Sequence, residues 1–489
     1  MNASTYPEGQ VSGLGIPCLL QRASISYEHE LAVISKYRQL TFDELEKKVQ
    51  IIGRYFCDQG IQRNDRVIIS LNNSVELVVT LLALMRIEAI PCPINPKFPT
   101  GLEERVTSLL DTSWFIGTHQ RSSTAHYIDA SSITAQLELE VPQDKSSPIY
   151  YSPTSPNSIV LTSGTSGTPK AAVFSYQQHY CSALGANDYI PLNIGDKSLL
   201  SLPMFHIGGI AIVFRCLLAG ATIVIPDDNE LTTNINRFHI THASMVNTQL
   251  KRLLRQDTTG TSLKHVLVGG GPVNQLLLTK AGALGINCYH TYGLTEMASQ
   301  VFTHDQNGTG QTLPYRQLSI DIKGEIIVKG ETLFLGYFEG GTTRLPLDAK
   351  GWFHTKDLGK LTGETLLVTG RKDNQFISGG ENIQPEEVEG LINSLPGVNQ
   401  SIVVPQKDSE YGLKPVVFID AKPPITVNRL KQYLITQIPS FKIPRTVYPW
   451  VFTQELKPSR KGLKEQADIF REDYHGNSGT LAPDIDLRG

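Results

Sequence analysis

A short segment, LTSGTSGTPKAAVF at residues 161–174, groups hydroxyl side chains and glycines just before a single lysine. Backbone N–H groups and hydroxyls in such a loop can donate to phosphate oxygens, and Lys170 would add a positive charge. A Walker A loop needs Gly-Lys followed by Ser or Thr at the start of a helix. Here Pro169 precedes the lysine and the apolar run AAVF follows it. The segment therefore predicts a phosphate-binding hairpin between two strands, with a plain surface loop as the alternative.

A second group of reactive side chains stands in YGLTE, residues 292–296, directly after the strand-like run NCYHT. Tyr292 could stack on adenine and Thr295 could donate to a phosphate. Glu296 could hold Mg2+, which prefers carboxylate oxygens together with phosphates and water. Ligands bind at the carboxyl ends of strands in open α/β sheets, so this position suits these roles. The alternative is an ordinary turn at the start of a helix, with Thr295 as its cap.

The glycine-rich run VGGGPV, residues 268–273, also follows a strand-like segment. Because glycine has no side chain, a flat ring can approach the backbone closely there. A tight turn into a helix that begins with Pro272 is the structural alternative, and it is compatible with such a role.

Apolar strand-like runs that alternate with helical patterns would position these segments. DRVIISL leads through SVELVVTLLALMRIEA to IPCPIN, KSLLSLPM leads through residues 208–219 to ATIVIP, and LKHVLVGGG leads through NQLLLTKAGALG to NCYHTYG. Such alternation predicts an α/β fold with doubly wound sheets, and strands that are apolar on both faces predict parallel sheets covered by helices.

After about residue 310 the pattern changes to short strand-like runs with glycine turns, which predicts a small antiparallel, barrel-like subdomain. Pro385 then suits the first turn of a helix, where acidic residues would complement the helix dipole. We place a domain boundary near Lys372 and Asp373. The domains expected are an N-terminal core at 1–371, a small mobile α+β C-terminal domain at 372–468, and a loosely ordered polar tail at 469–489.

Size and composition limit the classes of protein. A chain of 489 residues exceeds the ~250–300 residues at which a single core stops growing, so at least two domains are expected. A net charge of −3 gives no electrostatic footprint for nucleic acid or an anionic membrane. The six cysteines are scattered, without CxxC, which indicates a reducing compartment and no structural metal.

One apolar run, residues 207–225, has the length of a membrane span but carries Arg215 near its middle. A central arginine is costly in hydrocarbon, so we expect a buried helix that ends near Gly220 and a strand after it. The N-terminal residues MNASTYPEGQ lack the basic-then-apolar pattern of a secretion signal. A cytoplasmic protein without a membrane span is therefore expected.

Seven motifs, in order along nearly the whole chain, resemble those of the adenylate-forming superfamily, which includes acyl-CoA synthetases, luciferases and peptide-synthetase adenylation domains. They are LTSGTSGTPKA, LPMFHIGG, VGGGPV, YGLTE, GWFHTKD, GRKDNQFISGGENIQPEEVE and LKPSRKGLKE. The resemblance implies a two-step ligase that uses ATP, Mg2+ and coenzyme A. A carboxylate would attack ATP to give an acyl adenylate and pyrophosphate, and a thiol would then displace AMP.

The resemblance also implies roles for single residues. Lys457, placed by its K-x-x-R spacing to Arg460, would neutralise charge during the attack on ATP, His206 would border the acyl pocket, and Asp373 would be the hinge. Without this resemblance, Lys457 would be a solvated lysine and His206 a packed core residue. The phosphates of the nucleotide would contact the phosphate loop, which comprises Thr162, Ser163, Gly164, Thr165, Ser166, Gly167, Thr168 and Lys170. The adenine pocket would comprise Gly269, Gly270, Gly271, Pro272 and Tyr292, and the ribose would be bound by Asp357 and Arg371. Gly379 and Gly380 would serve the thioester step.

The alternative role for Asp357 and Arg371 is a surface salt bridge. The superfamily often has glycine where this chain has Lys356, which places an extra cation near the nucleotide.

Three stretches resemble the o-succinylbenzoate–CoA ligases of menaquinone biosynthesis: SGGENIQPEEVE, THASMVNTQLKRLL and FHIGGIAIVFRCLLAGA. Their substrate has two carboxylates, one activated and one spare. A buried guanidinium without a partner is costly, so Arg215 could hold the spare carboxylate, bidentate or through water. The alternative partners of Arg215 are a structural carboxylate or backbone carbonyls. The acyl pocket would also include Ser244, Asn247, Thr248, Gln249 and Gly293.

Other activities stay open at this point. They are a CoA ligase for another aryl or medium-chain acid, a stand-alone adenylation domain that loads a carrier protein, and a luciferase-like oxygenase. A non-catalytic nucleotide-binding regulator should have lost Lys457 or Glu296, and both are present. The expected partners are a small carboxylic acid, ATP and CoA, with no nucleic acid. The oligomeric state is left open, including a homo-oligomer.

Overall fold

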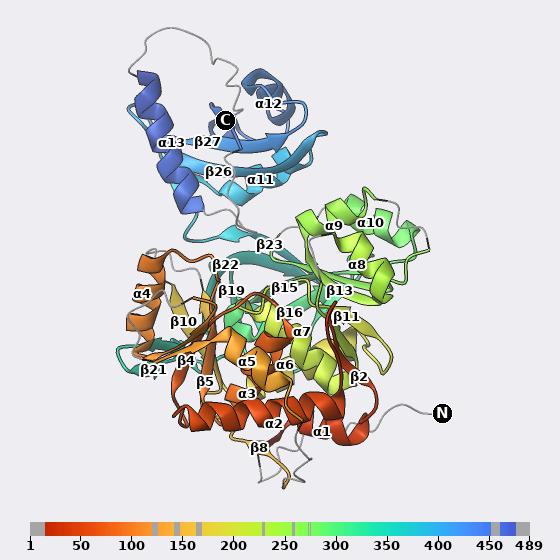
Figure 1. Ribbon diagram of the computed structural model, residues 1–489. Coiled ribbons are helices and arrows are strands. Elements are labelled where there is room, and N and C mark those ends of the chain that lie inside the picture. Colours follow the sequence, from red (N-terminus) through yellow and green to blue (C-terminus); the bar gives the residue numbers. More distant parts are fainter. Residues whose placement is uncertain are drawn as a thin grey trace. The chain divides into compact units, whose positions relative to one another are not determined.

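Buried strands connected through helices form most of the structure, a computed structural model of the α/β class (Figure 1). The structure describes residues 15–119, 126–140, 147–162, 169–226, 230–256, 260–271, 273, 275–450 and 460–475.

The chain divides into two units. The larger unit comprises residues 1–319, 327–354 and 362–366, and the smaller unit comprises residues 320–326, 355–361 and 367–489. The boundary that we predicted near Lys372 stays a prediction.

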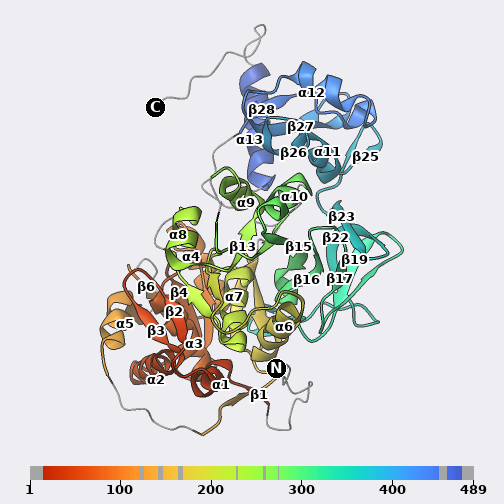
Figure 2. The same ribbon diagram turned by 90° about the vertical axis from the view of Figure 1, so that its right-hand side faces the viewer.

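A nine-stranded sheet is the largest sheet of the larger unit, and several of its strands lie side by side in Figure 2. Its inner strands are parallel: β11 pairs with β12 and β13, β13 with β14, and β14 with β15. In order across the sheet the strands are β17 (Gly310–Thr312), β16 (Ser299–His304), β15 (Asn287–Leu294), β14 (His265–Gly269), β13 (His242–Val246), β11 (Lys197–Leu199), β12 (Thr222–Val224), β2 (Leu31–Ile34) and β3 (Gln39–Thr41).

A second, parallel sheet has the order β5 (Ile90–Pro93), β4 (Arg66–Ser70), β6 (Trp114–Gly117) and β7 (His126–Asp129). Helix α3 (Val75–Arg86) connects β4 to the parallel strand β5, and its first turn is capped by the Ser74 side chain, which accepts from the Leu77 N–H. The helix between β11 and β12 and the helix between β14 and β15 make the same kind of connection. All three predicted βαβ units are therefore confirmed.

A third sheet brings together segments that are far apart in the sequence. Its order is β21 (Thr342–Arg344), β20 (Gly336–Glu339), β10 (Lys170–Phe174) and β9 (Ser158–Thr162). A further four-stranded sheet contains β18 (Gln317–Ile320), β19 (Glu325–Lys329), β22 (Phe353–Thr362) and β23 (Thr365–Arg371). The short strands predicted after residue 310 are thus present.

The helices of the larger unit pack on the sheets of that unit. Helix α7 (Ile207–Ala219) is buried along nearly its whole length and ends at Gly220, whose φ of +69° lies in the left-handed region. A side chain at Gly220 would also meet the Tyr27 ring. The prediction of a buried helix followed by a strand in this run is confirmed. The other helices of this unit are α1 (Leu19–Ser26), α2 (Phe42–Asp58), α4 (Thr100–Leu110), α5 (Ala130–Leu137), α6 (Tyr176–Tyr189), α8 (Leu231–Phe238), α9 (Asn247–Leu253) and α10 (Gln275–Ala283).

The smaller unit has its own core, built on β26 (Val398–Asp408), β27 (Gly412–Ala421) and β28 (Val447–Pro449). Helix α11 (Pro385–Asn393) begins with proline in its first turn, as predicted. Helix α12 (Val427–Leu434) and a two-stranded pair, β24 (Phe376–Ser378) and β25 (Glu381–Ile383), complete this part.

Helix α13 (Arg460–His475) corrects the prediction of a loosely ordered tail from residue 469. Leu463, Ala467 and Phe470 recur at helical spacing, and the Phe470 ring packs 5.2 Å from the Tyr448 ring. This apolar face extends the helix beyond the predicted start of the tail. Residues 476–489 lie outside the described part of the chain.

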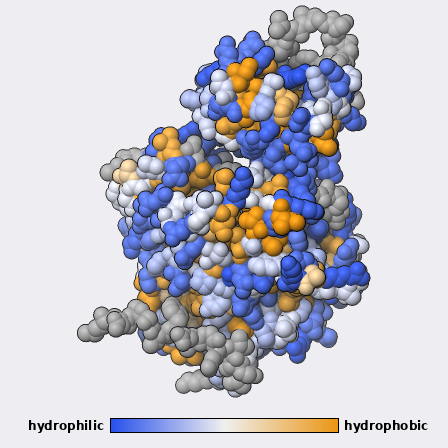
Figure 3. Space-filling model, turned by 180° about the vertical axis from the view of Figure 1, so that it is seen from behind, coloured by the Kyte–Doolittle hydropathy of each residue, from blue (hydrophilic) through white to orange (hydrophobic). Residues whose placement is uncertain are grey.

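The surface carries single large apolar side chains, including Ile25, Tyr37 and Ile322. Figure 3 shows small groups of hydrophobic residues among hydrophilic ones on the face opposite to that of Figure 1. Among the described residues, no helix has both the length and the apolar character needed to cross a membrane.

Candidate active site

The predicted phosphate loop connects the two antiparallel strands β9 and β10. Thr162, at the end of β9, pairs directly with Lys170, at the start of β10. The prediction that this loop joins two strands is confirmed, and a P-loop is excluded because no helix follows the lysine. Residues 163–168 of the loop lie outside the described residues. The Lys170 side chain is exposed at the mouth of the hairpin.

Lys170 and Glu296, two predicted site residues, both contact the side chain of Tyr337. The Tyr337 hydroxyl donates to Glu296 Oε1 at 2.5 Å, and Lys170 Nζ lies 4.7 Å from the centre of the Tyr337 ring. Sequence reasoning missed Tyr337. Its only local signal is a place in a short strand, and the contact arises because β20 pairs with β10, more than 160 residues earlier.

The YGLTE segment lies where β15 ends, at the carboxyl edge of the parallel strands. Leu294 closes the strand and caps a short 3-10 helix, Thr295–Met297, so the alternative in which Thr295 is the cap is wrong. Gly293 lies at an irregularity between β15 and β16, where a Cβ atom would be 2.1 Å from the Ser299 carbonyl oxygen. Only glycine fits there, and the bulge directs the residues that follow.

The glycine run begins where the neighbouring strand β14 ends, at Gly269. Gly270 has φ +82°, a left-handed conformation that glycine adopts without strain. A Cβ atom on Gly269 would lie 3.1 Å from the Thr291 side chain, so this glycine packs closely against β15. Gly271 is exposed, and Pro272 lies outside the described residues. The ends of β14 and β15 thus bring the predicted adenine residues of both strands, Tyr292 included, to one edge of the sheet.

Arg215 is held inside the larger unit by an amide. Helices α6 and α7 lie side by side (Figure 1 and Figure 2), and Arg215 Nε donates to Asn187 Oδ1 at 3.0 Å. In return Asn187 Nδ2 donates to the Arg215 carbonyl oxygen at 3.0 Å. Arg215 is only 8% exposed, and burial lowers the pKa of its guanidinium. Within the described part of the chain Arg215 makes no ion pair, so a structural carboxylate is not its partner there.

Four other residues predicted for the acyl pocket lie at the end of β13 and the start of α9. Ser244 is buried, and its carbonyl oxygen accepts from the Ser201 hydroxyl. Gln249 accepts from the Val246 N–H at 3.0 Å and so caps α9. Asn247 Oδ1 is buried without a hydrogen-bond partner among the described residues, and Thr248 beside it is half-buried.

His206 precedes α7 and is exposed, which corrects the alternative in which it is a packed core residue. Its ring stands edge-on to Phe205, with the ring centres 4.7 Å apart. Gly209, one turn into the helix, faces the Pro203 carbonyl oxygen, which a Cβ atom would approach to 2.3 Å. The two glycines after His206 therefore let the start of α7 pack against the preceding loop.

Asp357, Arg371 and Asp373 form one connected group in the smaller unit. Arg371 donates to Asp357 Oδ1 at 3.1 Å and, through Nε and Nη2, to the Asp373 carboxylate at 3.0 and 3.3 Å. Burial acts to raise the pKa of the Asp373 carboxyl, but the hydrogen bond and charge of Arg371 outweigh it and hold that pKa below its usual value. The predicted ribose pair is thus joined by an ion pair and is linked to the predicted hinge.

Lys356, the departure from the superfamily pattern, has a φ of +64°. This left-handed conformation costs a non-glycine residue roughly 1–2 kcal/mol, which explains why glycine suits the position. The strain is offset locally, because the Lys356 N–H donates to the buried Glu325 carboxylate at 2.9 Å.

Gly379 and Gly380 form the turn between β24 and β25 with φ values of +55° and +88°. A Cβ atom on Gly379 would lie 2.8 Å from the Tyr411 ring, so a side chain there would disturb the turn. Lys457 lies outside the described residues. Three residues later, Arg460 at the start of α13 is ion-paired with Glu389 and Glu386.

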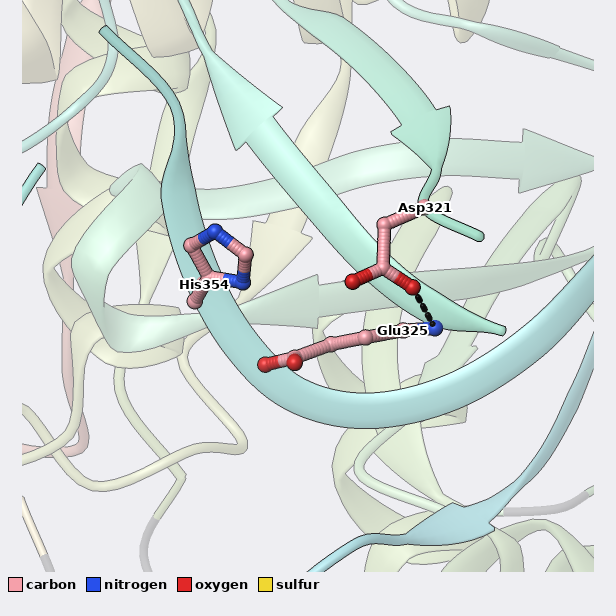
Figure 4. A group of neighbouring side chains, drawn as sticks. All are labelled: Asp321, Glu325 and His354. Carbon is pink, nitrogen blue, oxygen red and sulfur yellow. Dashed lines mark hydrogen bonds between the residues drawn. The ribbon is translucent and has the colours of Figure 1, made fainter. Parts of the chain in front are cut away.

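Asp321, Glu325 and His354, drawn in Figure 4, each have partners within their own unit. Asp321 Oδ1 accepts from the Glu325 N–H at 2.8 Å, and Glu325 is ion-paired with Lys372 at 3.1 Å. His354 is ion-paired with Asp348 at 3.5 Å. Because an ammonium already neutralises Glu325, we assign no metal to these residues.

Comparisons with known proteins give the same family along the chain. Residues 20–338 match the model of the AMP-binding enzyme family, and residues 387–462 match that of the AMP-binding enzyme C-terminal domain. The chain is 36% identical over 387 residues to a 2-succinylbenzoate–CoA ligase of Salmonella typhimurium. This aligned region covers 78% of this chain and 82% of the relative.

Two solved structures are similar over nearly their whole length. An arginine-to-lysine variant of E. coli MenE with bound OSB-AMS has a TM-score of 0.83 and 31% identity, covering 93% of this chain and 99% of that one. The o-succinylbenzoate coenzyme A synthetase (MenE) of Bacillus subtilis, in complex with ATP and a magnesium ion, has a TM-score of 0.82 and 25% identity, covering 92% of this chain and 99% of that one.

Proposed function

The chain belongs to the AMP-binding enzyme family, and from this premise we propose that it is an ATP-dependent 2-succinylbenzoate–CoA ligase of menaquinone biosynthesis. It would convert 2-succinylbenzoate, ATP and CoA into 2-succinylbenzoyl-CoA, AMP and diphosphate. The relative and the solved structures of this activity, which cover 78% to 93% of the chain, support the proposal.

In the first half-reaction a carboxylate oxygen of the acid attacks the α-phosphorus of ATP. The bond from that phosphorus to the bridging oxygen breaks, and pyrophosphate leaves with the electron pair. The hairpin that ends at Lys170 would bind the departing phosphates, and Lys457 would neutralise the charge that develops on the α-phosphate. Tyr292 and the glycines after β14 would hold the adenine, and Asp357 with Arg371 the ribose.

Glu296 is the residue that would hold Mg2+, and the structure offers a test of this fit. One carboxylate oxygen accepts from Tyr337, while the other makes no hydrogen bond to the described residues. A single free carboxylate oxygen suits Mg2+, which takes its remaining ligands from phosphates and water. When bound, the ion supplies charge neutralisation for the ATP phosphates.

In the second half-reaction the thiol of CoA loses its proton to solvent and its sulfur attacks the acyl carbon of the adenylate. The acyl–oxygen bond breaks, and AMP leaves with the electron pair. The turn at Gly379 and Gly380 would serve this step, after a rotation of the C-terminal domain about Asp373. Both assignments follow the family pattern and are part of the proposal.

One observation carries the choice of acid: Arg215 is buried, it is fixed by Asn187, and it has no ion pair among the described residues. A buried guanidinium needs an anionic partner to offset the cost of desolvation. The spare carboxylate of 2-succinylbenzoate would be such a partner, whereas benzoate or a simple fatty acid has no second carboxylate. Asn247 Oδ1, buried and without a hydrogen-bond partner among the described residues, is a second polar atom in the set predicted for the acyl pocket.

The activity is tested by pyrophosphate release from ATP with 2-succinylbenzoate, benzoate or hexanoate, each with and without CoA. We expect release and thioester formation with 2-succinylbenzoate only. Equal rates with all three acids would contradict the specificity. Pyrophosphate release without any thioester in the presence of CoA would instead indicate an adenylation domain that loads another thiol.

The Arg215 assignment has its own test. Arg215→Ala removes charge-assisted hydrogen bonds worth about 1.5–3 kcal/mol, so the KM for 2-succinylbenzoate should rise about 10- to 100-fold, with the KM for ATP unchanged. If the KM for the diacid stays the same, Arg215 does not bind the spare carboxylate.

We also propose a cytoplasmic location. It is supported by the six cysteines, all of which are free, and by the intracellular supply of ATP and CoA that the reaction requires. Fractionation of cells that express the chain, with a cytoplasmic enzyme as marker, tests this location.

A further inference from the structure

We propose that Tyr337 is a positioning residue that orients Glu296 for Mg2+ through its hydroxyl and Lys170 for the departing phosphates through its ring. The inference rests on the proposed function, in which Glu296 and Lys170 act on ATP. It adds a residue outside the motifs that predicted the site.

The hydroxyl contact fixes one oxygen of the carboxylate. The Tyr337 hydroxyl donates to Glu296 Oε1 at 2.5 Å, and both residues are partly buried. A hydrogen bond to one oxygen limits rotation of the carboxylate and keeps the other oxygen directed elsewhere. Partners of this kind, which hold a metal-binding carboxylate in place, typically contribute 10- to 100-fold to metal affinity.

The ring contact places the ammonium of Lys170. Its Nζ lies 4.7 Å from the centre of the Tyr337 ring, within the range of a cation–π interaction. The register explains the contact, because Tyr337 pairs directly with Ala172, two residues after Lys170 on the same face of β10. Lys170 is therefore the diagonal neighbour of Tyr337, and the small Ala172 side chain leaves room for the ring.

The segment that carries Tyr337 is itself tied to Glu296 and to β10. The Phe334 N–H donates to the Glu296 carbonyl oxygen at 2.8 Å, and the Leu335 N–H donates to the Val173 carbonyl oxygen at 2.8 Å. The buried Phe334 ring stands edge-on to the Tyr337 ring at 4.8 Å. The Phe334 ring therefore packs against the Tyr337 ring, while the Tyr337 hydroxyl contacts the Glu296 carboxylate and the ring contacts the Lys170 ammonium.

These two contacts belong to different atoms, so two substitutions separate them. Tyr337→Phe removes the hydroxyl and keeps the ring, whereas Tyr337→Leu removes both. Tyr37→Phe, at an exposed position, is the matched control for loss of a hydroxyl. Circular dichroism and thermal unfolding of each variant show that the fold is retained.

The first measurement is Mn2+ binding to the enzyme–ATP complex, without acid, followed by electron paramagnetic resonance. Mn2+ stands in for Mg2+ because both prefer carboxylate and phosphate oxygens. Tyr337→Phe should weaken Mn2+ binding about 10-fold, and the control should leave it unchanged.

The second measurement is the affinity of each variant for ATP and for AMP, determined by calorimetry in the presence of EDTA. Tyr337→Leu should weaken ATP binding about two- to fivefold. The affinity for AMP should be unchanged, because Lys170 acts only on the outer phosphates.

Glu296→Gln tests whether Glu296 is the metal ligand, and so separates that assignment from the positioning role of Tyr337. If Glu296→Gln abolishes Mn2+ binding while Tyr337→Phe leaves it unchanged, the positioning role of the hydroxyl is wrong and the proposed function stands. If Glu296→Gln also leaves Mn2+ binding unchanged, Glu296 is not the metal ligand and the inference falls with that assignment. Equal loss of ATP and AMP affinity in Tyr337→Leu would overturn the role of the ring.

Discussion

The side-chain amide of Asn187 holds the buried guanidinium of Arg215 in one orientation. Its two polar atoms pair with the side chain and the backbone of Arg215, both at 3.0 Å. A neutral partner fixes the orientation of the guanidinium without cancelling its charge. The positive charge is therefore available to the anion that we propose as its partner.

Asn187→Asp should neutralise the charge of Arg215 while keeping the size of the side chain. The new carboxylate would pair with Arg215 and compete with the substrate, so the KM for 2-succinylbenzoate should rise on the order of 10-fold, with the KM for ATP unchanged. Steady-state kinetics measure both constants, and Asn193→Asp, at an exposed position, is the control. An unchanged KM for the diacid in Asn187→Asp would show that the charge of Arg215 is not used in binding.

Predictions at the residue scale succeeded where neighbouring residues in the sequence determine the local backbone structure. Pro169 and the apolar residues after Lys170 excluded a helix, and β10 begins at that lysine. The sequence could not reveal Tyr337 or Asn187, because their partners are 28 or more residues away and are brought near only by the packing of α6 on α7 and of β20 on β10. Contacts of this kind depend on tertiary register, which a local motif does not encode.

At the scale of elements, the βαβ units were predictable because apolar runs of strand length alternate with helical periodicity. The last helix was missed because acidic and basic residues dominate its sequence, while the apolar residues of its packed face, Leu463, Ala467 and Phe470, are only three. Those three positions recur every three or four residues, and they cover Val404, Val416 and Phe418 of β26 and β27.

Phe470 should therefore stabilise the smaller unit. Phe470→Ala removes ring contacts with Tyr448 at 5.2 Å and Phe418 at 6.4 Å. Because Phe470 is only partly buried, the free energy of unfolding should fall by about 2 kcal/mol, less than for a core phenylalanine. Urea unfolding measures the change, and Ile469→Ala, which is half exposed on the same helix, should cost under about 0.5 kcal/mol. Equal effects of both substitutions would mean that this face of α13 does not pack as described.

At the scale of the whole molecule, three histidines of the larger unit, two buried and one partly buried, should link stability to pH. Burial is the largest cause that lowers the pKa of His179 to about 3, of His242 to about 4 and of His290 to about 4. For His242 the nearby Asp196 acts to raise the pKa and Arg215 to lower it, and for His290 the neighbouring His304 lowers it further. All three imidazoles are therefore neutral in the folded protein at neutral pH.

The sign of the pH dependence follows from where each state takes up protons. Unfolded histidine binds a proton near pH 6.5, whereas these folded imidazoles do so only near pH 3 to 4. Between those values the unfolded chain holds more protons, so the free energy of unfolding falls as the pH drops below about 6.5. Each histidine contributes up to about 1.4 kcal/mol per pH unit, and the three together should remove about 5 kcal/mol between roughly pH 7 and pH 5.

Urea unfolding at a series of pH values over that range measures this slope for the chain and for two variants. His290→Asn, which keeps an N–H near the Gly271 backbone but cannot take up a proton, should reduce the slope by about one third. His29→Asn, at an exposed position, is the control for loss of an imidazole. Most carboxylates of an unfolded chain titrate below this range, so a free energy of unfolding that stays flat from neutral pH to about pH 5 would mean that these three histidines do not carry the acid sensitivity of the fold.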